Sequence, residues 1–251
     1  MSKIAFVTGG SRGLGKDMVL RIAEKGLDVV LTYKSNKEEA AKVVEAIEAK
    51  GQKAFAVQLD TSEIDSFDAV IAEIKTTLKE KRGKETIDYL VNNAGIGLGN
   101  SITETTEEQF DTLSNIHLKG VFFLTQKLIP ILNPGGGIIN VSSGLARFCM
   151  PGYAAYAMMK GGIEVFSRYL AKELGSKGIR ANTIAPGAIE TDFGGGAVRD
   201  NEQYNKAVAS ATALGRAGLP QDIGSVVAFL CTEEARWINA QRIEVSGGMN
   251  I

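Results

Sequence analysis

The chain is short of the residues that build metal centres and hydrolytic triads. Among its 251 residues there is one histidine, His117, and there are two cysteines, Cys149 and Cys231. A structural zinc needs about four Cys or His ligands, and a Ser-His-Asp hydrolase needs a histidine beside its nucleophile, so we expect neither class and no metal. Cysteines this far apart form no disulfide framework, and we expect two free thiols. His117 lies in an apolar helical region, where we expect a half-buried structural residue.

Charge imbalance and long hydrophobic runs are missing as well. The formal net charge is −1, which offers no basic surface to nucleic acid. No apolar run approaches the roughly 18 residues of a membrane span, and the N-terminal residues lead into a predicted strand without a signal-peptide region. We therefore expect a cytoplasmic protein that binds neither nucleic acid nor membranes. The hydrophobic fraction of 44% suffices for one sizeable core, and we expect a single domain over residues 1–251.

Predicted strands and helices alternate along the chain. Strands are expected at 4–8, 28–32, 53–58, 89–91, 137–141, 180–184 and 242–245, and helices after the first strand and at 37–50, 62–81, 106–132, 153–176 and 221–230. This alternation predicts an α/β fold, with a doubly wound, Rossmann-like parallel sheet of seven strands and helices on both faces. Ligands of such sheets bind beyond the carboxyl ends of the strands. Polar and glycine residues that follow the predicted strands are therefore candidate site residues.

A glycine-rich turn, T-G-G-S-R-G-L-G at 8–15, separates the first predicted strand from the first helix. Glycines at such a turn let the backbone approach a pyrophosphate, and the free N–H groups at the start of the helix bind its charge. The position of the turn, and not the glycine content alone, therefore predicts a dinucleotide site.

Tyr156 and Lys160 form the most informative pair in the chain. They are four residues apart in Y-A-M-M-K within a predicted helix, so their side chains share one face, about 5–6 Å apart at Cβ. A cation at that distance typically lowers the pKa of an acid by about 1–3 units. We therefore expect Lys160 to lower the pKa of Tyr156, which could then serve as a general acid or base.

These features occur together with others in a fixed order. The chain carries T-G-x-x-x-G-x-G, then N-N-A-G at 92–95, Asn115, Ser143, Y-x-x-x-K, and P-G at 186–187. In this it resembles the short-chain dehydrogenase/reductase family over essentially its whole length. The resemblance implies a catalytic set of Asn115, Ser143, Tyr156 and Lys160. Ser143 is preferred to Ser142 because it lies thirteen residues before Tyr156, as the family requires.

Each catalytic residue has an expected role by this resemblance. Tyr156 would donate the proton to a carbonyl oxygen, and Ser143 would donate a hydrogen bond that orients that oxygen. Lys160 would lower the pKa of Tyr156 and bind the nicotinamide ribose. Asn115 would hold a water that links Lys160 to solvent. Met159 departs from the serine or threonine usual before the lysine, and we expect it to alter packing only.

The resemblance also implies a cofactor site and the identity of the cofactor. The residues implied are Gly9, Ser11, Arg12, Gly13, Leu14, Gly15, Tyr33, Lys34, Asp60, Thr61, Asn93, Ala94, Gly95, Tyr156, Lys160, Pro186, Gly187, Ile189 and Thr191. Relatives that prefer NAD place an acidic residue after the second strand, and here Tyr33 and Lys34 stand there. Together with Arg12 in the glycine turn, this favours NADP(H). Asp60 resembles the residue that hydrogen bonds to the adenine amine.

Two segments are expected to bind the substrate. Residues 144–153 would form one wall, and the glycine- and alanine-rich stretch of about 193–214 a mobile lid. The substrate-binding residues that we expect are Ser143, Leu145, Met150, Tyr153, Tyr156 and Phe193. Most of this wall is apolar, which favours an apolar or aromatic ketone, although Arg147 leaves an anionic group open.

The sequence therefore predicts NADPH-dependent, reversible reduction of a ketone to a secondary alcohol. One alternative is a 3-oxoacyl-[acyl-carrier-protein] reductase, for which Lys119 and Lys127 are too few basic residues to decide. A non-catalytic NADP(H)-binding sensor is an alternative of another class, disfavoured by the complete catalytic set. Apolar helices after 106 and 153 form the subunit interface in the family, so a homotetramer is the expected assembly.

Overall fold

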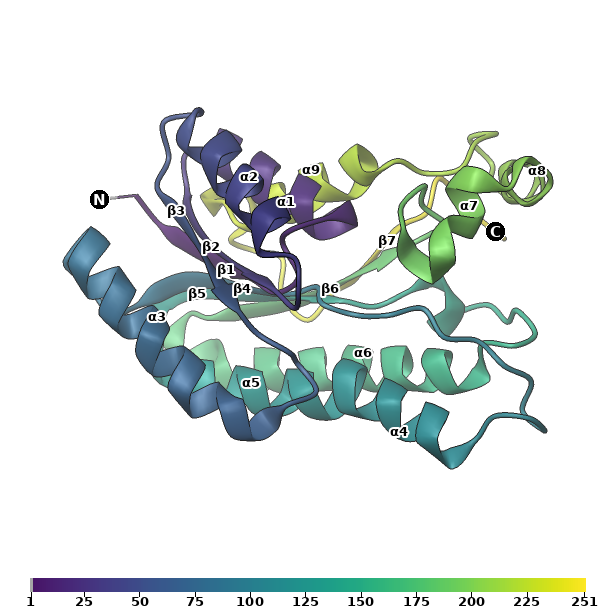
Figure 1. Ribbon diagram of the computed structural model, residues 1–251, viewed down its shortest axis with the longest axis horizontal. Coiled ribbons are helices and arrows are strands. Elements are labelled where there is room, and N and C mark those ends of the chain that lie inside the picture. The colour runs from purple at the N-terminus through teal and green to yellow at the C-terminus, as the bar shows by residue number, and fades with distance from the viewer. Residues whose placement is uncertain (1) are drawn as a thin grey trace.

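The computed structural model describes residues 2–251 and has a seven-stranded parallel sheet at its centre (Figure 1). The strands are β1 (Ile4–Val7), β2 (Asp28–Tyr33), β3 (Ala54–Gln58), β4 (Ile87–Asn92), β5 (Leu132–Val141), β6 (Arg180–Pro186) and β7 (Arg242–Val245). Their order in the sheet is β3-β2-β1-β4-β5-β6-β7, and every neighbouring pair is parallel. This confirms the predicted doubly wound α/β fold, whose strand order reverses direction beside β1.

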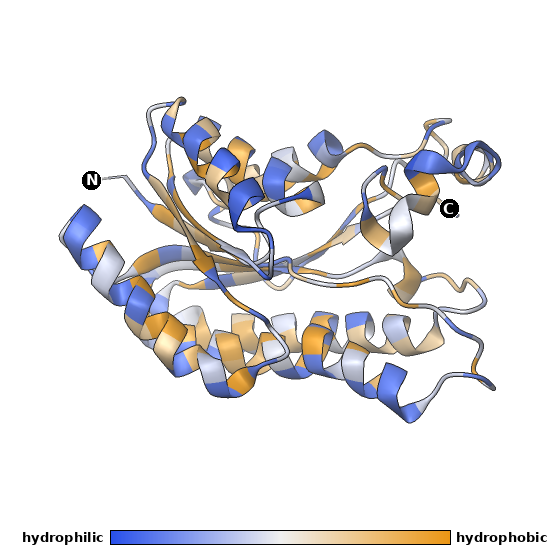
Figure 2. Ribbon diagram, viewed as in Figure 1, coloured by the Kyte–Doolittle hydropathy of each residue, from blue (hydrophilic) through white to orange (hydrophobic). Residues whose placement is uncertain are grey.

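Helices cover both faces of the sheet (Figure 1). One layer consists of α1 (Gly13–Glu24), α2 (Lys37–Glu48) and α9 (Pro220–Leu230), and the opposite layer of α3 (Phe67–Arg82), α4 (Glu107–Ser114), α5 (Gly120–Leu128) and α6 (Ala154–Leu174). Side chains alternate between the faces along a strand. In β1, Ala5 and Val7 therefore join the core under the first layer, and Ile4 and Phe6 join the core under the second. Figure 2 shows the hydrophobic sides of the helices turned toward the sheet.

The single helix predicted at 106–132 is wrong. The segment divides into α4, a π-helix at Asn115–Lys119, α5 and a short 3-10 helix at Ile129–Ile131, and Leu132 already belongs to β5. The π-helix arises where the backbone runs against the loop after β3. A Cβ on Gly120 would lie 1.9 Å from the carbonyl oxygen of Thr61, so only glycine allows this approach. Single π turns inside helices are frequently found at functional sites.

The stretch expected to be a glycine-rich lid is folded into short helices. A 3-10 turn at Phe193–Gly196 precedes α7 (Ala197–Asp200) and α8 (Glu202–Ser210). Three successive glycines, Gly194 to Gly196, have φ of 61°, 74° and 78°, a region that side chains other than glycine rarely adopt. Both short helices lie together at one end of the molecule, near the C-terminus (Figure 1). Within the described residues, no helix is long and apolar enough to cross a bilayer.

Candidate active site

The glycine turn has the geometry of a phosphate cradle. Gly9 and Gly13 have φ of 67° and 54°, and a Cβ on Gly15 would lie 2.1 Å from the carbonyl oxygen of Gly9. The turn leads directly into α1, whose first turn has no acidic side chain and no side-chain cap. Its N–H groups are therefore left to a ligand, and the helix dipole favours an anion there. These residues fit the pyrophosphate of a dinucleotide.

The N-N-A-G segment secures this turn from the adjacent strand. The Thr8 hydroxyl accepts hydrogen bonds of 3.0 Å from the backbone N–H groups of Asn93 and Ala94. In return, the Asn93 amide donates to the carbonyl oxygens of Thr8, at 2.9 Å, and Gly9, at 3.2 Å. A Cβ on Gly9 would lie 3.1 Å from Ala94 Cα. The carboxyl ends of β1 and β4 are thus held together in the place where the cofactor is expected.

The residues expected to select the cofactor differ in how exposed they are. Tyr33 ends β2 with its side chain in the hydrophobic core, at 8% exposure. The Lys34 ammonium lies 2.6 Å from a carboxylate oxygen of Asp60. Desolvation opposes ionisation of Asp60, but hydrogen bonds from Lys34 and Ser62 outweigh it and lower the pKa of that carboxyl. Arg12 precedes α1 and is exposed. Of the two cations expected to select the cofactor, Lys34 is thus paired with Asp60 and Arg12 is exposed.

The P-G segment closes the opposite side of the glycine turn. Pro186 ends β6, and the backbone N–H of Gly187 donates to the carbonyl oxygen of Val245 at 3.1 Å. A few residues on, the side chain of Thr191 is buried and would lie 3.7 Å from a Cβ on Gly13. The fold therefore brings the start of α1 and the segment after β6 together across the ends of the strands.

Tyr156 and Lys160 lie on one face of α6, as predicted, and both are buried, with 6% and 5% exposure. The Lys160 ammonium lies 5.6 Å from the centroid of the Tyr156 ring and donates to the carbonyl oxygen of Val141 at 2.8 Å. Burial lowers the pKa of Lys160 to about 7. The predicted lowering of the Tyr156 pKa is wrong for this structure, in which the net shift is upward. Desolvation raises the pKa of the phenol, and a hydrogen bond with Ser143 only partly offsets this effect.

Ser143 and Ser142 follow β5 and have separate partners. The Ser143 hydroxyl accepts a hydrogen bond of 3.2 Å from the backbone of Leu145, and it faces Tyr156. The Ser142 hydroxyl instead donates to Glu164 at 2.7 Å, one helical turn beyond Lys160. The preference for Ser143 as the residue beside Tyr156 agrees with this geometry.

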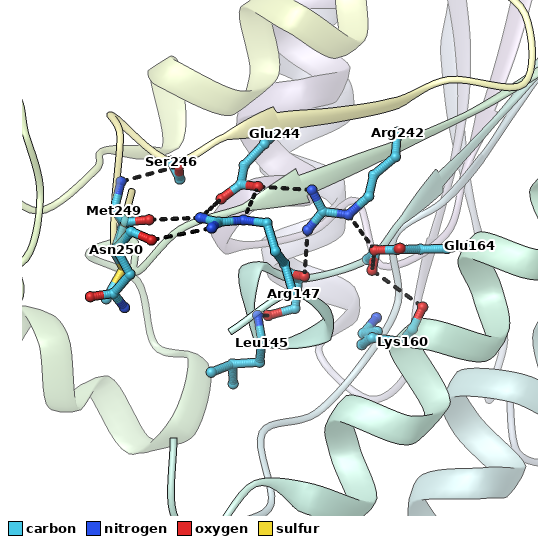
Figure 3. A network of polar contacts seen from close by, with 11 residues as sticks. Leu145, Arg147, Lys160, Glu164, Arg242, Glu244, Ser246, Met249 and Asn250 are labelled. Carbon is cyan, nitrogen blue, oxygen red and sulfur yellow. Dashed lines mark hydrogen bonds and ion pairs between the residues drawn. The ribbon is translucent and has the colours of Figure 1, made fainter. Parts of the chain in front are cut away.

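A network of ion pairs extends from Glu164 to the C-terminal segment (Figure 3). Arg242 on β7 donates to Glu164 at 2.7 Å, to Glu244 at 2.8 Å and to the Ser143 carbonyl oxygen at 3.4 Å. Arg147 donates two 2.7 Å hydrogen bonds to Glu244 and further bonds to the carbonyl oxygens of residues 249 and 250. Hydrogen bonds from Arg147, against some desolvation, lower the pKa of Glu244 to about 2. Arg147 is thus neutralised internally, which removes the reason to expect an anionic substrate.

The structure brings His117 against Tyr156. His117 is 1% exposed, so the expectation of a half-buried residue is wrong. Its ring meets the Tyr156 ring edge to face, with centroids 5.2 Å apart. The Asn115 carbonyl oxygen accepts from the N–H of Gly120, which closes the π turn.

The expected substrate wall lies around the phenol of Tyr156. Phe193 approaches Tyr156 with ring centroids 6.1 Å apart, and Leu145 packs on the small cluster that contains Tyr156. Met150 accepts a weak hydrogen bond at 3.7 Å from the hydroxyl of Tyr204 on α8. Tyr153 precedes α6 and lies close enough to Tyr156 to contribute to its raised pKa. The two predicted walls therefore meet beside the phenol and are mostly apolar or aromatic.

Both thiols are free, as predicted: Cys149 is exposed, and burial raises the pKa of Cys231 to about 12. No group of metal-ligating side chains occurs among residues 2–251.

Sequence reasoning missed three functional contacts. It assigned no role to Thr8, Arg242 or Glu164, and it assigned His117 to the scaffold. The hydroxyl of Thr8 directly after a buried strand was a usable signal, because polar side chains at strand ends line such sites. The Arg242–Glu164 contact joins residues 78 positions apart, and no local pattern reveals it.

Comparisons with known proteins agree with this geometry. The family model described as enoyl-(acyl carrier protein) reductase matches residues 9–250. The chain is 37% identical over 251 residues to the 3-oxoacyl-[acyl-carrier-protein] reductase FabG of Staphylococcus aureus (strain Mu50 / ATCC 700699), covering 99% of this chain and 98% of the relative.

Two solved ketoreductases have the same fold. The promiscuous reductase LugOII, which catalyses keto-reduction at C1 during lugdunomycin biosynthesis, superposes with a TM-score of 0.94 at 37% identity, covering 99% and 98% of the two chains. The landomycin C-6 ketoreductase LanV with bound NADP and rabelomycin superposes with a TM-score of 0.90 at 35% identity, covering 99% and 96%. With its motifs, its strand order and these full-length similarities, the chain belongs to the short-chain dehydrogenase/reductase family.

Proposed function

We propose that the protein reduces a ketone to a secondary alcohol with NADPH, using Tyr156 as the proton donor. The observation that carries this proposal is the buried pair Tyr156 and Lys160, with the half-buried Ser143 beside the phenol and a phosphate cradle at the glycine turn. Because its pKa is raised, Tyr156 is neutral at physiological pH and holds the proton that reduction needs. NADPH, when bound, supplies the hydride to the carbonyl carbon.

The chain's own residues have separate tasks in this reaction. Ser143 donates its hydroxyl proton as a hydrogen bond to the carbonyl oxygen, and Tyr156 transfers its phenolic proton to that oxygen as the alcohol forms. Lys160, held at 2.8 Å by the Val141 carbonyl oxygen, stabilises the phenolate left behind. Burial of Tyr156 and Lys160 keeps water from both groups, which strengthens the electrostatic interactions that they make.

Arg12 and Lys34 support the choice of NADPH over NADH. Lys34 directly follows β2 and Arg12 directly precedes α1 in the glycine turn, and no carboxylate occupies the position after β2. In the Lys34–Asp60 ion pair, the lysine side chain is 67% exposed. A 2′-phosphate can therefore compete with Asp60 for this ammonium. LanV is solved with NADP bound, which also supports this choice.

An apolar or aromatic ketone fits the site better than a charged substrate does. Phe193, Leu145 and Met150 surround the phenol, and Arg147 is already paired. A 3-oxoacyl thioester is the second candidate, supported by the full-length similarity to FabG. Of the two lysines considered for carrier protein binding, Lys127 is paired with Asp68, which weakens this candidate.

NADPH oxidation with a panel of aromatic ketones and with an acetoacetyl thioester tests the proposal. We expect turnover with the ketones, and a loss of about 10²–10⁴-fold in kcat for Tyr156→Phe. Faster turnover of the thioester would replace the first substrate class by the second. Tight NADPH binding without any turnover would instead favour a sensor.

A homotetramer is the assembly that we propose. Large apolar side chains are exposed along α4, α5 and α6, namely Phe110, Phe122, Met158, Val165 and Tyr169. Several large apolar side chains exposed on helices that already cover the sheet support a protein interface on this layer. Sedimentation equilibrium should give four times the mass of 26.7 kDa, and a monomer at micromolar concentration would contradict this assembly.

A further inference from the structure

His117 is the one buried ionisable side chain of the site to which the proposed reaction gives no task. It lies in the π-helix between α4 and α5, where the chain reaches the centre of the site. Tyr156 and Lys160 face it from α6, and Gly95 and Ile96 face it from the loop after β4. The loop side offers only backbone atoms, so Lys160 is the charged group that acts on the ring.

The hydrogen bonds of the ring identify its tautomer. Nε2 lies 2.9 Å from the carbonyl oxygen of Ile96 and 3.3 Å from the backbone nitrogen of the same residue. One nitrogen cannot donate and accept at once, and the shorter contact is to the carbonyl oxygen. The proton is therefore on Nε2, and Nδ1 carries a lone pair.

Nδ1 is buried, and no group among residues 2–251 hydrogen bonds to it. A buried acceptor without a partner is costly, by about 1–3 kcal/mol, and such groups persist mainly where function requires them. Desolvation, together with the charge of Lys160, lowers the pKa of His117 to about 3. The ring is thus neutral throughout the physiological range and adds no second cation beside Lys160.

The ring also limits its neighbours sterically. A Cβ on Gly95 would lie 2.5 Å from Cε1 of His117, so the N-N-A-G loop is packed directly onto the imidazole. On the opposite side the imidazole meets Tyr156 edge to face at an interplanar angle of 88°, a favourable arrangement for aromatic pairs. A displacement of His117 would move both the loop that lies beside the cofactor and the phenol.

We propose that His117 is a positioning residue of the catalytic set. As a neutral, Nε2-protonated ring, it holds the phenol of Tyr156 and the backbone at Ile96 in the positions that catalysis needs. This inference rests on the proposed function, because the position that His117 maintains is the one from which Tyr156 transfers its proton.

The first test compares three variants. In His117→Phe the aromatic packing remains but both nitrogens are lost, and we expect kcat to fall roughly tenfold to a hundredfold, as a misplacement of about 1 Å would produce. The KM for ketone and the dissociation constant for NADPH should change less than about threefold. The variant keeps the interactions that bind the ground state and the transition state equally. In His117→Asn the amide can donate to and accept from Ile96, and kcat should recover to within about threefold of wild type.

Asn115→Ala provides the discriminating comparison, because Asn115 lies in the same π-helix and is the residue that the sequence predicted for the catalytic set. A larger loss of kcat in Asn115→Ala than in His117→Phe would overturn the proposal. It would also be overturned if His117→Phe lost stability and NADPH binding in proportion to kcat, or if His117→Asn were as impaired as His117→Phe.

The second test does not depend on turnover, so it separates this proposal from the proposed function. Because the chain has one histidine, ¹⁵N-labelled histidine gives a single imidazole in the NMR spectrum. We expect the neutral Nε2–H tautomer at every pH from 8 to 5, and a shift of the Nδ1 resonance when NADP⁺ binds. Titration near the ordinary value of about 6.5, or an Nδ1–H tautomer, would overturn the proposal even in a fully active enzyme.

Discussion

Replacement of Lys160 by methionine should make the protein more stable and inactive. The ammonium is buried, and desolvation lowers its pKa from 10.5 to about 7. At about 1.36 kcal/mol per pKa unit, this shift corresponds to a folding penalty of about 5 kcal/mol. Methionine fills a similar volume without the charge. It leaves the Val141 carbonyl oxygen without its donor, which costs about 1–3 kcal/mol, so we expect a net gain of about 2–4 kcal/mol.

The pH dependence of this gain follows from the same shift. Below pH 7, Lys160 is charged in both the folded and the unfolded protein, and the wild type carries the whole penalty. Between pH 7 and pH 10.5 only the unfolded state keeps the proton, so the free energy of unfolding of the wild type rises with pH. The advantage of Lys160→Met should therefore be largest at pH 6 and shrink toward pH 10.

Urea unfolding at pH 6, 8 and 9.5 measures both effects. Lys172→Met, an exposed change on the same helix α6, is the matched control and should alter stability by no more than about 0.5 kcal/mol at any pH. An unfolding free energy of Lys160→Met at or below that of the wild type at pH 6 would refute the reasoning, as would a gain that does not vary with pH.

Four other substitutions test three separate parts of the site. Lys34→Ala and Arg12→Ala should each raise the KM for NADPH roughly tenfold, the value of one charge-assisted hydrogen bond, and leave the KM for NADH unchanged; equal effects on both cofactors in steady-state kinetics would contradict the phosphate assignment. Arg242→Gln removes the ties to Glu164 and to the Ser143 backbone, so both kcat and the melting temperature should fall, and a normal kcat would show that the ion-pair network does not position Ser143. Phe193→Ala should raise the KM for aromatic ketones more than the KM for small aliphatic ones, and an equal change in both would exclude an aromatic wall.

The sequence predicted the strands well because a strand that is buried on both faces is an unbroken apolar run between glycines and polar residues. The same holds for Tyr156 and Lys160, whose relation depends only on helical spacing. Local periodicity cannot reveal a π turn, since the cause is the approach of Gly120 to Thr61, nearly sixty positions away. One helix was therefore predicted where two occur.

The contact between His117 and Tyr156 was missed because of that turn. A change in helical repeat alters which side chains face inward, and His117 therefore faces Tyr156. Ion pairs between residues that are far apart in the sequence were missed for a similar reason. The sequence left Arg147 free for a substrate, whereas it pairs with Glu244, 97 positions further along the chain. It also predicted a lowered pKa for Tyr156 from the nearby charge, without the desolvation that raises it.

The transfer of hydrogen itself tests the central claim most directly. NADPH deuterated at one or the other hydrogen of C4 would be incubated with the enzyme and an aromatic ketone, and the alcohol analysed by mass spectrometry. The account predicts that one of the two labels, and only one, appears on the carbinol carbon, and that Tyr156→Phe forms the same labelled product at a strongly reduced rate. An alcohol without deuterium from either label, or an undiminished rate in Tyr156→Phe, would contradict it.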